Sequence, residues 1–254
     1  MRRPLVMGNW KLHGTKASVE KLLVELMVTA NEVEGVEVAV CPPVIFMGQA
    51  ERLLRYSNIA LGAQNIDFNR QGAFTGEVSP DMLKEFGVRY VLVGHSERRA
   101  LHHETDELVA RKFEAVKEAG LTPVLCVGET QAERNNGETQ DVIGHQLQAV
   151  VKRCGRKSFE DAVVAYEPVW AIGSGQAASP IDAQKVHAFI RAQVAAQDKA
   201  HSDALRILYG GSVKASNARS LFMMDDVDGA LVGGASLDAS EFSAIFKDAI
   251  KGAA

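Results

Sequence analysis

Short apolar segments alternate along the chain with longer amphipathic stretches. Each apolar segment has four to six residues, and most are rich in β-branched residues and apolar almost throughout. This composition is typical of parallel strands that are covered on both faces. We expect strands at Leu5–Trp10, Glu37–Cys41, Ile59–Gln64, Tyr90–Gly94, Thr122–Val127, Ala162–Glu167, Arg206–Tyr209 and Gly229–Val232.

The stretches between these segments carry apolar residues at helical spacing. Val109, Phe113 and Val116 fall at positions i, i+4 and i+7. A longer series of the same kind lies near the C-terminus, at Phe242, Ile245, Phe246, Ala249 and Ile250. Such a face packs against a sheet while the opposite face meets water. The chain therefore reads as a repeated strand-then-helix unit.

Local signals mark where several of these helices begin and end. Ser79–Pro80 and Ser179–Pro180 place a capping serine before a proline, which suits the first turn of a helix. Asp238 and Glu241 have the spacing of a capping box. Gly120 follows a helical stretch, as a C-terminal stop does.

The number of units predicts the architecture. No linker, low-complexity tract or charge block divides the chain, so we expect one domain over residues 1–254. Eight strand–helix units in about 250 residues have the size of a (β/α)8 TIM barrel, with eight parallel strands ringed by helices. A doubly wound open sheet is the competing architecture. The barrel is favoured because candidate functional residues follow many different strands, and no single Gly-rich strand-to-helix motif dominates.

Composition narrows the class of protein. The chain is 46% hydrophobic and 24% charged, as globular proteins are, and its net charge of −4 argues against nucleic-acid or membrane binding. No apolar run approaches the ~20 residues of a membrane span. The three cysteines form no CxxC pair, which fits a reducing compartment. Gly8 and Asn9 interrupt the N-terminal apolar run too early for a signal peptide. We expect a cytoplasmic protein.

One carboxylate stands at a strand end directly before a loop. Glu167 closes an apolar run, and Pro168 stops it because proline has no N–H for a ladder. Gly173 and Gly175 then punctuate an apolar segment, which suits a loop that bends at defined points. This placement suits a general base. An acidic strand end beside an ordinary surface loop is the alternative.

Other strand ends carry further candidate groups. Lys11 follows the first strand and could meet an anionic substrate, although a solvated lysine is the alternative. His95 follows the fourth strand at the expected start of a helix, where the dipole disfavours the protonated imidazole. A capped loop histidine without a role is the alternative there. Cys126, at the fifth strand, reads as a small core filler.

Paired glycines follow the last two strands. Gly210-Gly211 is followed by Ser212, and Gly233-Gly234 stands at the corresponding place after the eighth strand. Glycines leave backbone N–H groups uncovered for an anion, and barrels often bind phosphate at this position. The chain has no Walker-type lysine motif, metal-ligand cluster or cofactor fingerprint, so we expect no metal and no cofactor. The set suits proton abstraction beside a carbonyl in a small phosphorylated sugar.

Several motifs occur together in one order along the chain. They are Gly8–Lys11, Gly62–Asn65, Gly72–Glu77, Gly94–Arg99, Tyr166–Gly173, Tyr209–Ser212 and Leu231–Leu237. In combination they are specific, and the chain resembles the triosephosphate isomerase family over essentially its full length. The resemblance implies cofactor-free interconversion of dihydroxyacetone phosphate and D-glyceraldehyde 3-phosphate, an aldose–ketose isomerisation of glycolysis and gluconeogenesis.

The resemblance also implies roles for individual residues. Glu167 would move a proton between two carbons through an enediolate while a neutral His95 polarises the carbonyl. Lys11 and Asn9 would contact the substrate and stabilise its oxyanion. The phosphate would be held by amides at Gly173, Ser212, Gly233 and Gly234. Ser96, Glu97 and Cys126 would support the reacting groups from behind. A flexible loop from Pro168 to about Ala178 would close over the substrate.

A homodimer follows from the same resemblance. The loop over residues 65–79 would insert into the neighbouring subunit and bring Thr75 near its site, with Phe74 at the tip as a contact. The loop is long for a compact barrel, and long ordered loops are usually functional. A mobile surface loop is the alternative reading of the sequence itself.

The chain departs from the common family pattern at a few places. Ser174 and Gln176 replace a threonine and a lysine in the loop after Glu167, and His13 and His102-His103 replace other residues. We expect these histidines to be structural or solvated. Two other functions stay open: another phosphate-binding barrel enzyme such as an aldolase, and a catalytically silent dimeric scaffold.

Overall fold

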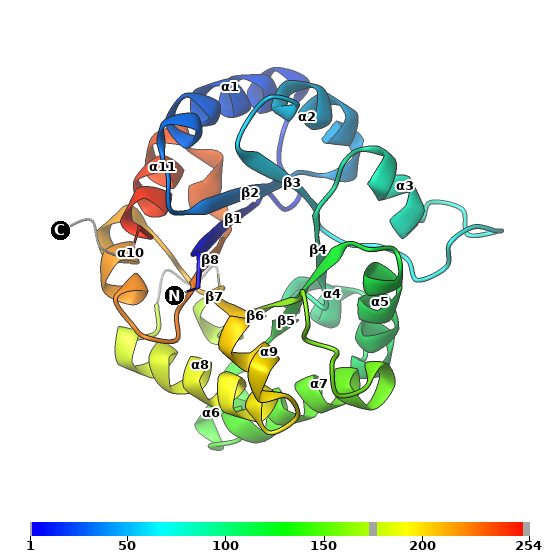
Figure 1. Ribbon diagram of the computed structural model, residues 1–254, viewed down its shortest axis with the longest axis vertical. Coiled ribbons are helices and arrows are strands. Elements are labelled where there is room, and N and C mark those ends of the chain that lie inside the picture. The colour runs from blue at the N-terminus through cyan, green and yellow to red at the C-terminus, as the bar shows by residue number, and fades with distance from the viewer. Residues whose placement is uncertain (1, 173–176, 251–254) are drawn as a thin grey trace.

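The computed structural model describes residues 2–172 and 177–250, and within these ranges eight parallel strands close into a barrel (Figure 1). The strands are β1 (Leu5–Asn9), β2 (Glu37–Cys41), β3 (Ile59–Ala63), β4 (Tyr90–Val93), β5 (Thr122–Val127), β6 (Val163–Tyr166), β7 (Arg206–Tyr209) and β8 (Gly229–Val232). Leu5 of β1 pairs both with Glu37 of β2 and with Gly229 of β8. This last pairing closes the sheet, so the prediction of a TIM barrel is confirmed and the open sheet is excluded.

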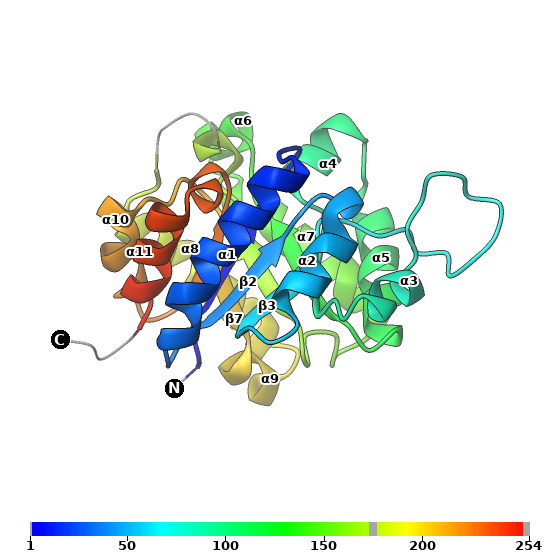
Figure 2. The ribbon, with the colours of Figure 1, turned by 90° about the horizontal axis from the view of Figure 1, so that it is seen from above.

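Helices surround the strands on the outside of the barrel (Figure 1). They are α1 (Lys16–Glu32), α2 (Met47–Leu54), α3 (Pro80–Glu85), α4 (Ser96–Leu101), α5 (Asp106–Glu118), α6 (Gln131–Asn135), α7 (Thr139–Cys154), α8 (Pro180–Ala195), α9 (Lys199–Ala204), α10 (Ala215–Phe222) and α11 (Ala239–Asp248). Short 3-10 turns lie at Val44–Phe46, Val169–Ala171 and Gly234–Leu237. Seen from the side, α4 and α6 lie at the end of the barrel where the strands finish, and α9 lies at the opposite end (Figure 2).

Several predicted strands extend one residue beyond the observed ladder. The residues concerned are Trp10, Gln64, Gly94, Ala162 and Glu167. Two of them keep a backbone bond to a neighbouring strand: the Trp10 N–H donates to the Cys41 carbonyl at 3.1 Å, and the Glu167 N–H donates to the Val127 carbonyl at 2.7 Å. At these two positions the chain stays beside the sheet after regular pairing stops.

The predicted helix caps are present, with one difference. Ser79 caps α3 and Ser179 caps α8 through hydrogen bonds from N–H groups in the first turn. Asp238 accepts from the N–H of Glu241 at 2.8 Å, as a cap residue does. The return bond of the expected capping box is not formed, because the Glu241 carboxylate accepts instead from the N–H of Ala215, 2.8 Å away. Glu241 therefore ties α11 to α10.

The barrel interior is filled by buried side chains of different sizes, of which Tyr90 is the largest. The inward-facing set is Leu5, Met7, Ala39, Cys41, Tyr90, Leu92, Val124, Cys126, Val163, Ala165, Leu208 and Leu231. Cys126 is fully buried among them, and burial raises the pKa of its thiol. This agrees with the interpretation of Cys126 as a core residue.

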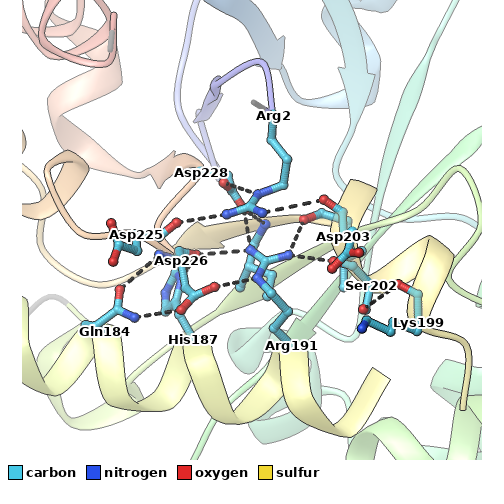
Figure 3. A network of polar contacts seen from close by, with 12 residues as sticks. Arg2, Gln184, His187, Arg191, Lys199, Ser202, Asp203, Asp225, Asp226 and Asp228 are labelled. Carbon is cyan, nitrogen blue, oxygen red and sulfur yellow. Dashed lines mark hydrogen bonds and ion pairs between the residues drawn. The ribbon is translucent and has the colours of Figure 1, made fainter. Parts of the chain in front are cut away.

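A polar network ties α8 to the loop that precedes β8 (Figure 3). Arg191 donates to the carboxylates of Asp226 and Asp228 and to the backbone carbonyls of Ser202 and Leu205. Arg2 donates to Asp228 at 2.6 Å, so the N-terminal segment joins the same network. Asp228 is 1% exposed, which makes this a buried ionic cluster.

The segment between β3 and α3 projects from the barrel in both ribbon views (Figures 1 and 2). Phe74, near its tip, is 45% exposed, and Thr75 is also exposed. Among the described residues, no helix is long and apolar enough to cross a membrane.

Candidate active site

The C-terminal ends of the strands surround a cavity of about 380 Å³. It is lined by side chains from opposite sides of the barrel, including Asn9 and Lys11 after β1, His95 after β4 and Glu167 after β6. The glycine-rich turns after β7 and β8 complete its wall. Strand ends that are far apart in the sequence thus meet at one mouth, as the barrel prediction requires.

Glu167 is the most enclosed of these groups. Its main chain follows β6, and its side chain is 3% exposed. One carboxylate oxygen lies 2.9 Å from Nε2 of His95, and the other accepts from the N–H of Ser96 at 2.8 Å. The Ser96 contact agrees with the expectation that this residue supports Glu167 in its resting position.

His95 is held in one tautomer by its two neighbours. It is the N-cap of α4, and its Nδ1 accepts from the N–H of Glu97 at 3.2 Å. An Nδ1 that accepts a hydrogen bond carries no proton, so Nε2 carries it and donates to Glu167. The neutral imidazole satisfies both hydrogen bonds. It presents an N–H into the cavity.

The pKa of His95 corrects the prediction made from its place at a helix start. Burial acts to lower this pKa, but the Glu167 carboxylate and its hydrogen bond outweigh burial, so the pKa of His95 lies above its ordinary value. This direction is opposite to the one expected from the helix start alone, because a carboxylate lies at hydrogen-bond distance from the imidazole. The sequence could not place Glu167 against His95.

The pKa of Glu167 moves in the opposite direction. Burial acts to raise it, but His95, the Ser96 N–H and Lys11 together hold it below its usual range. The carboxylate is therefore ionised near neutral pH. That is the state in which a carboxylate accepts a proton.

Lys11 has a backbone conformation that few lysines adopt. Its φ is +50°, in the left-handed region that costs non-glycine residues energy. Gln64 holds this turn by donating to the Lys11 carbonyl at 2.9 Å, and Asn9 accepts from the Lys11 N–H at 3.1 Å. The ammonium lies 2.6 Å from a carboxylate oxygen of Glu97. Glu97, which the resemblance implies as a supporting residue, thus lies beside Lys11.

The glycine turns present uncovered backbone to the cavity. Gly210, Gly211, Ser212, Gly233 and Gly234 all line it. A Cβ built on Gly234 would meet no atom within 4 Å, so this stretch of main chain is open to a ligand. These turns can hold an anion through their N–H groups. Gly173, the remaining predicted phosphate residue, lies outside the described residues, as do Ser174 and Gln176.

Glu129 and Tyr209 hold the segment that follows Glu167 through hydrogen bonds. The sequence pattern had not indicated a role for either residue. Glu129 is fully buried and accepts from the Tyr166 hydroxyl at 3.1 Å and from the Trp170 indole at 3.0 Å. The Tyr209 hydroxyl accepts from the N–H of Ala178 at 3.0 Å. A charged residue two positions after a buried strand was the available signal for Glu129.

Thr75 and Phe74 do not line the cavity that contains Glu167. The base of their loop lines a separate cavity of about 570 Å³, together with Lys11, His95 and Glu97. Both cavities are lined by Asn9, Lys11 and His95, so the base of the loop is next to the site within this chain. Among the described residues, no group of three or more His, Cys, Asp or Glu side chains is placed to hold a metal ion.

The fold and this cavity define a (β/α)8-barrel protein of the kind that carries its functional groups at the carboxyl ends of the strands. The family model of triosephosphate isomerase matches residues 4–249. The chain belongs to the triosephosphate isomerase family, as its motifs predicted.

Relatives match the chain over nearly its full length. A triosephosphate isomerase from Histophilus somni (strain 129Pt) is 55% identical over 250 residues, which cover 98% of each chain. Those from Haemophilus ducreyi (strain 35000HP) and Vibrio vulnificus (strain YJ016) are each 54% identical, over 98% and 99% of each chain.

Proposed function

We propose that this chain interconverts dihydroxyacetone phosphate and D-glyceraldehyde 3-phosphate by proton transfer, as a single catalytic domain over residues 1–254. Family membership and full-length identity of 54–55% with named triosephosphate isomerases support the reaction. The observation that carries the proposal is the buried pair of Glu167 and His95, 2.9 Å apart, in a cavity walled by glycine-rich turns. An ionised base, an N–H donor and an anion cradle then face the same small space.

Glu167 removes a proton from the substrate carbon next to the carbonyl. The electron pair of the C–H bond forms the enediolate, and the proton is returned to the neighbouring carbon. Nε2–H of His95 donates to the substrate oxygen on which charge develops, and His95 carries the hydroxyl proton from one substrate oxygen to the other, so that the carbonyl moves to the carbon that was first deprotonated. In the described state that N–H points at Glu167. A bound substrate would therefore separate the two side chains, accept the His95 hydrogen bond and meet the Glu167 carboxylate.

Lys11 and Asn9 stabilise the oxyanion from the β1 side. The Glu97 carboxylate, 2.6 Å from the Lys11 ammonium, fixes the position of this charge. Amides at Ser212, Gly233, Gly234 and Gly173 bind the substrate phosphate, which holds the reacting carbons at the base.

The protein acts in the cytoplasm as a homodimer, in glycolysis and gluconeogenesis. The loop over residues 65–79, with Thr75 and Phe74 exposed, inserts into the neighbouring subunit. Exposed apolar side chains on a projecting loop support this docking, because water-facing aromatic residues often mark an interface.

A Schiff-base aldolase fits this cavity less well. Its lysine works as a free amine in an apolar pocket. Lys11 instead faces the Glu97 carboxylate, and its side chain is 26% exposed. The cavity therefore supports proton transfer better than amine catalysis.

The test is isomerisation of D-glyceraldehyde 3-phosphate by the purified chain without added metal or cofactor. We expect rapid formation of dihydroxyacetone phosphate. A folded chain that forms none, and that cleaves or isomerises another phosphorylated sugar instead, overturns the proposal.

A further inference from the structure

Glu167 is followed and flanked by main chain that has little room to move. Its N–H donates to the Val127 carbonyl at 2.7 Å, and the Val169 N–H donates to the Glu129 carbonyl at 3.1 Å. Gly128 lies between these two bonds. A Cβ on Gly128 would lie 1.8 Å from the Glu167 carbonyl oxygen, so the two backbones are in direct contact. A displacement of Gly128 therefore displaces Glu167.

The opposite edge of Gly128 has no strand beside it. The pairing of β5 with β4 stops at Leu125 and Val93. In place of a strand, the side-chain amide of Gln146 bonds both backbone groups of Gly128. Gln146 accepts from the Gly128 N–H at 2.8 Å and donates to the Gly128 carbonyl at 3.2 Å.

Gln146 is a polar residue on an apolar helix face. It is 9% exposed on α7, where Ile143, Leu147 and Val150 are the other buried residues. A buried amide at such a position is retained only where its hydrogen bonds are made, because an unpaired one is costly. The oxygen and the nitrogen of this side-chain amide both form their hydrogen bonds with Gly128.

The space behind the Glu167 carboxylate is not filled by side chains. A cavity of about 280 Å³ lies there, lined by Gln146, Gly128 and Glu167 together with Ser96, Arg99 and Cys126. Because this space is open, side-chain packing does not hold the Glu167 segment on the side of Gly128 and Gln146. The two hydrogen bonds between Gln146 and Gly128 supply the restraint there.

We propose that Gln146 is a positioning residue for the base, acting through Gly128 to fix the backbone of Glu167. This inference rests on the proposed function of Glu167. No residue of α7 lines the cavity proposed to bind the substrate. The inference nevertheless gives this helix a role in positioning the catalytic base. Misplacement of a reacting group by about 1 Å costs ~10²-fold in rate, so a few tenths of an ångström are sufficient to be measured.

The first test replaces Gln146 by methionine, which keeps the length of the side chain and removes both hydrogen bonds. We expect kcat to fall about tenfold or more while KM and competitive inhibition by inorganic phosphate stay within about twofold, since the glycine turns lie on the other side of the base. Gln148→Met, on the exposed face of the same helix, is the matched control and keeps the parent values. A folded Gln146→Met with parent kcat overturns the inference, as does an equal loss of phosphate binding.

A second variant separates positioning from stability. Gln146→Glu keeps an acceptor for the Gly128 N–H but faces the Gly128 carbonyl with a carboxylate. Protonation of that carboxyl restores the donor. The kcat of Gln146→Glu relative to the parent should therefore rise as the pH falls from 8 to 5, and a flat ratio overturns the inference. This variant decides the question if Gln146→Met does not fold.

A third measurement does not depend on the reaction. If Gln146→Met draws Glu167 away from His95, the pKa of His95 falls, and the imidazole titration followed by NMR shifts to lower pH. Gln148→Met leaves it unchanged. An inactive parent counts against the proposed function alone, and an unshifted titration in Gln146→Met counts against the role of Gln146.

Discussion

The carboxylate of Glu167 lies 2.9 Å from Nε2 of His95, so the proposed base and the proposed proton donor are paired with each other when no substrate is between them. His95 receives a further hydrogen bond at Nδ1 from the Glu97 N–H, which leaves its proton on Nε2. The pair is nearly closed to solvent. Each group therefore sets the ionisation of the other.

Removal of the Glu167 charge is expected to lower the pKa of His95. In the parent, that carboxylate outweighs burial and raises the pKa, whereas in Glu167→Gln burial remains without its counterpart. NMR titration of the ring nitrogens measures the shift. Glu114→Gln serves as the control, because it removes the carboxylate of a half-buried ion pair with Arg153 outside the cavity. The His95 titration should stay unchanged in this variant. An unchanged pKa in Glu167→Gln would show that the two groups are not in contact in solution.

Acid destabilisation is expected to depend on His187. This residue is fully buried, donates from Nδ1 to the Asp226 carbonyl and packs against the rings of Tyr166 and Tyr209, which also contact each other. Burial lowers the pKa of His187 to about 4. The unfolded chain, with an ordinary histidine pKa of about 6.5, binds a proton that the folded chain does not, so stability falls as the pH falls from about 6.5 to 4.

This loss amounts to about 3 kcal/mol once the pH is below both values. His187→Gln removes the titrating group and should flatten this part of the profile, whatever it costs at pH 7. Urea unfolding at one protein concentration, from pH 7 to pH 4, measures the difference. Parallel profiles for parent and variant would show that His187 is protonated in the folded state.

The sequence predicted the barrel and the strand-end groups because both depend on local pattern. Apolar runs locate the strands, and closure then brings Lys11, His95 and Glu167 together without further information. Contacts made across the fold were not predictable. The partner of Glu241, for instance, is Ala215 on another helix and not its own helix end.

The direction of the His95 pKa shift was not predictable for the same reason. A helix start is visible in the sequence, but the distance to Glu167 is not. Gln146 was missed although its signal was present, since a glutamine stands between Ile143 and Val150 on the buried face of a helix. The pattern shows that such a residue is buried, and only the structure shows that Gly128 is its partner.

The ionic cluster around Arg191 is expected to be a major contributor to stability (Figure 3). Arg191→Met removes the partner shared by the partly exposed Asp226 and the buried Asp228, and leaves Asp228 with Arg2 alone, which costs about 3 kcal/mol, the lower end for a broken buried pair. Arg55→Met breaks a surface ion pair with Glu51 outside the projecting loop and is the matched control, with an unchanged midpoint. Urea denaturation measures both. Equal midpoints for the two variants would mean that the cluster contributes no more than a surface pair.

Dimerisation is expected to depend on the projecting loop. Phe74→Asp places a charge on an aromatic tip that the proposed dimer buries against its partner. We expect a concentration-dependent shift toward monomer in analytical ultracentrifugation, with a fall in kcat. Tyr56→Asp, at an even more exposed aromatic residue outside the loop, is the comparison. A Phe74→Asp protein that remains dimeric at low concentration contradicts docking through this loop.

The measurement that tests the account most directly is the kcat of Glu167→Gln on D-glyceraldehyde 3-phosphate, beside the parent. Glutamine keeps the shape of the side chain but cannot accept the proton, so we predict a loss of at least about 10²-fold in kcat, the smaller end of what general base catalysis contributes. The phosphate-binding turns are untouched, so KM should change far less. Turnover in Glu167→Gln within a few-fold of the parent would contradict the account, because another group would then be the base.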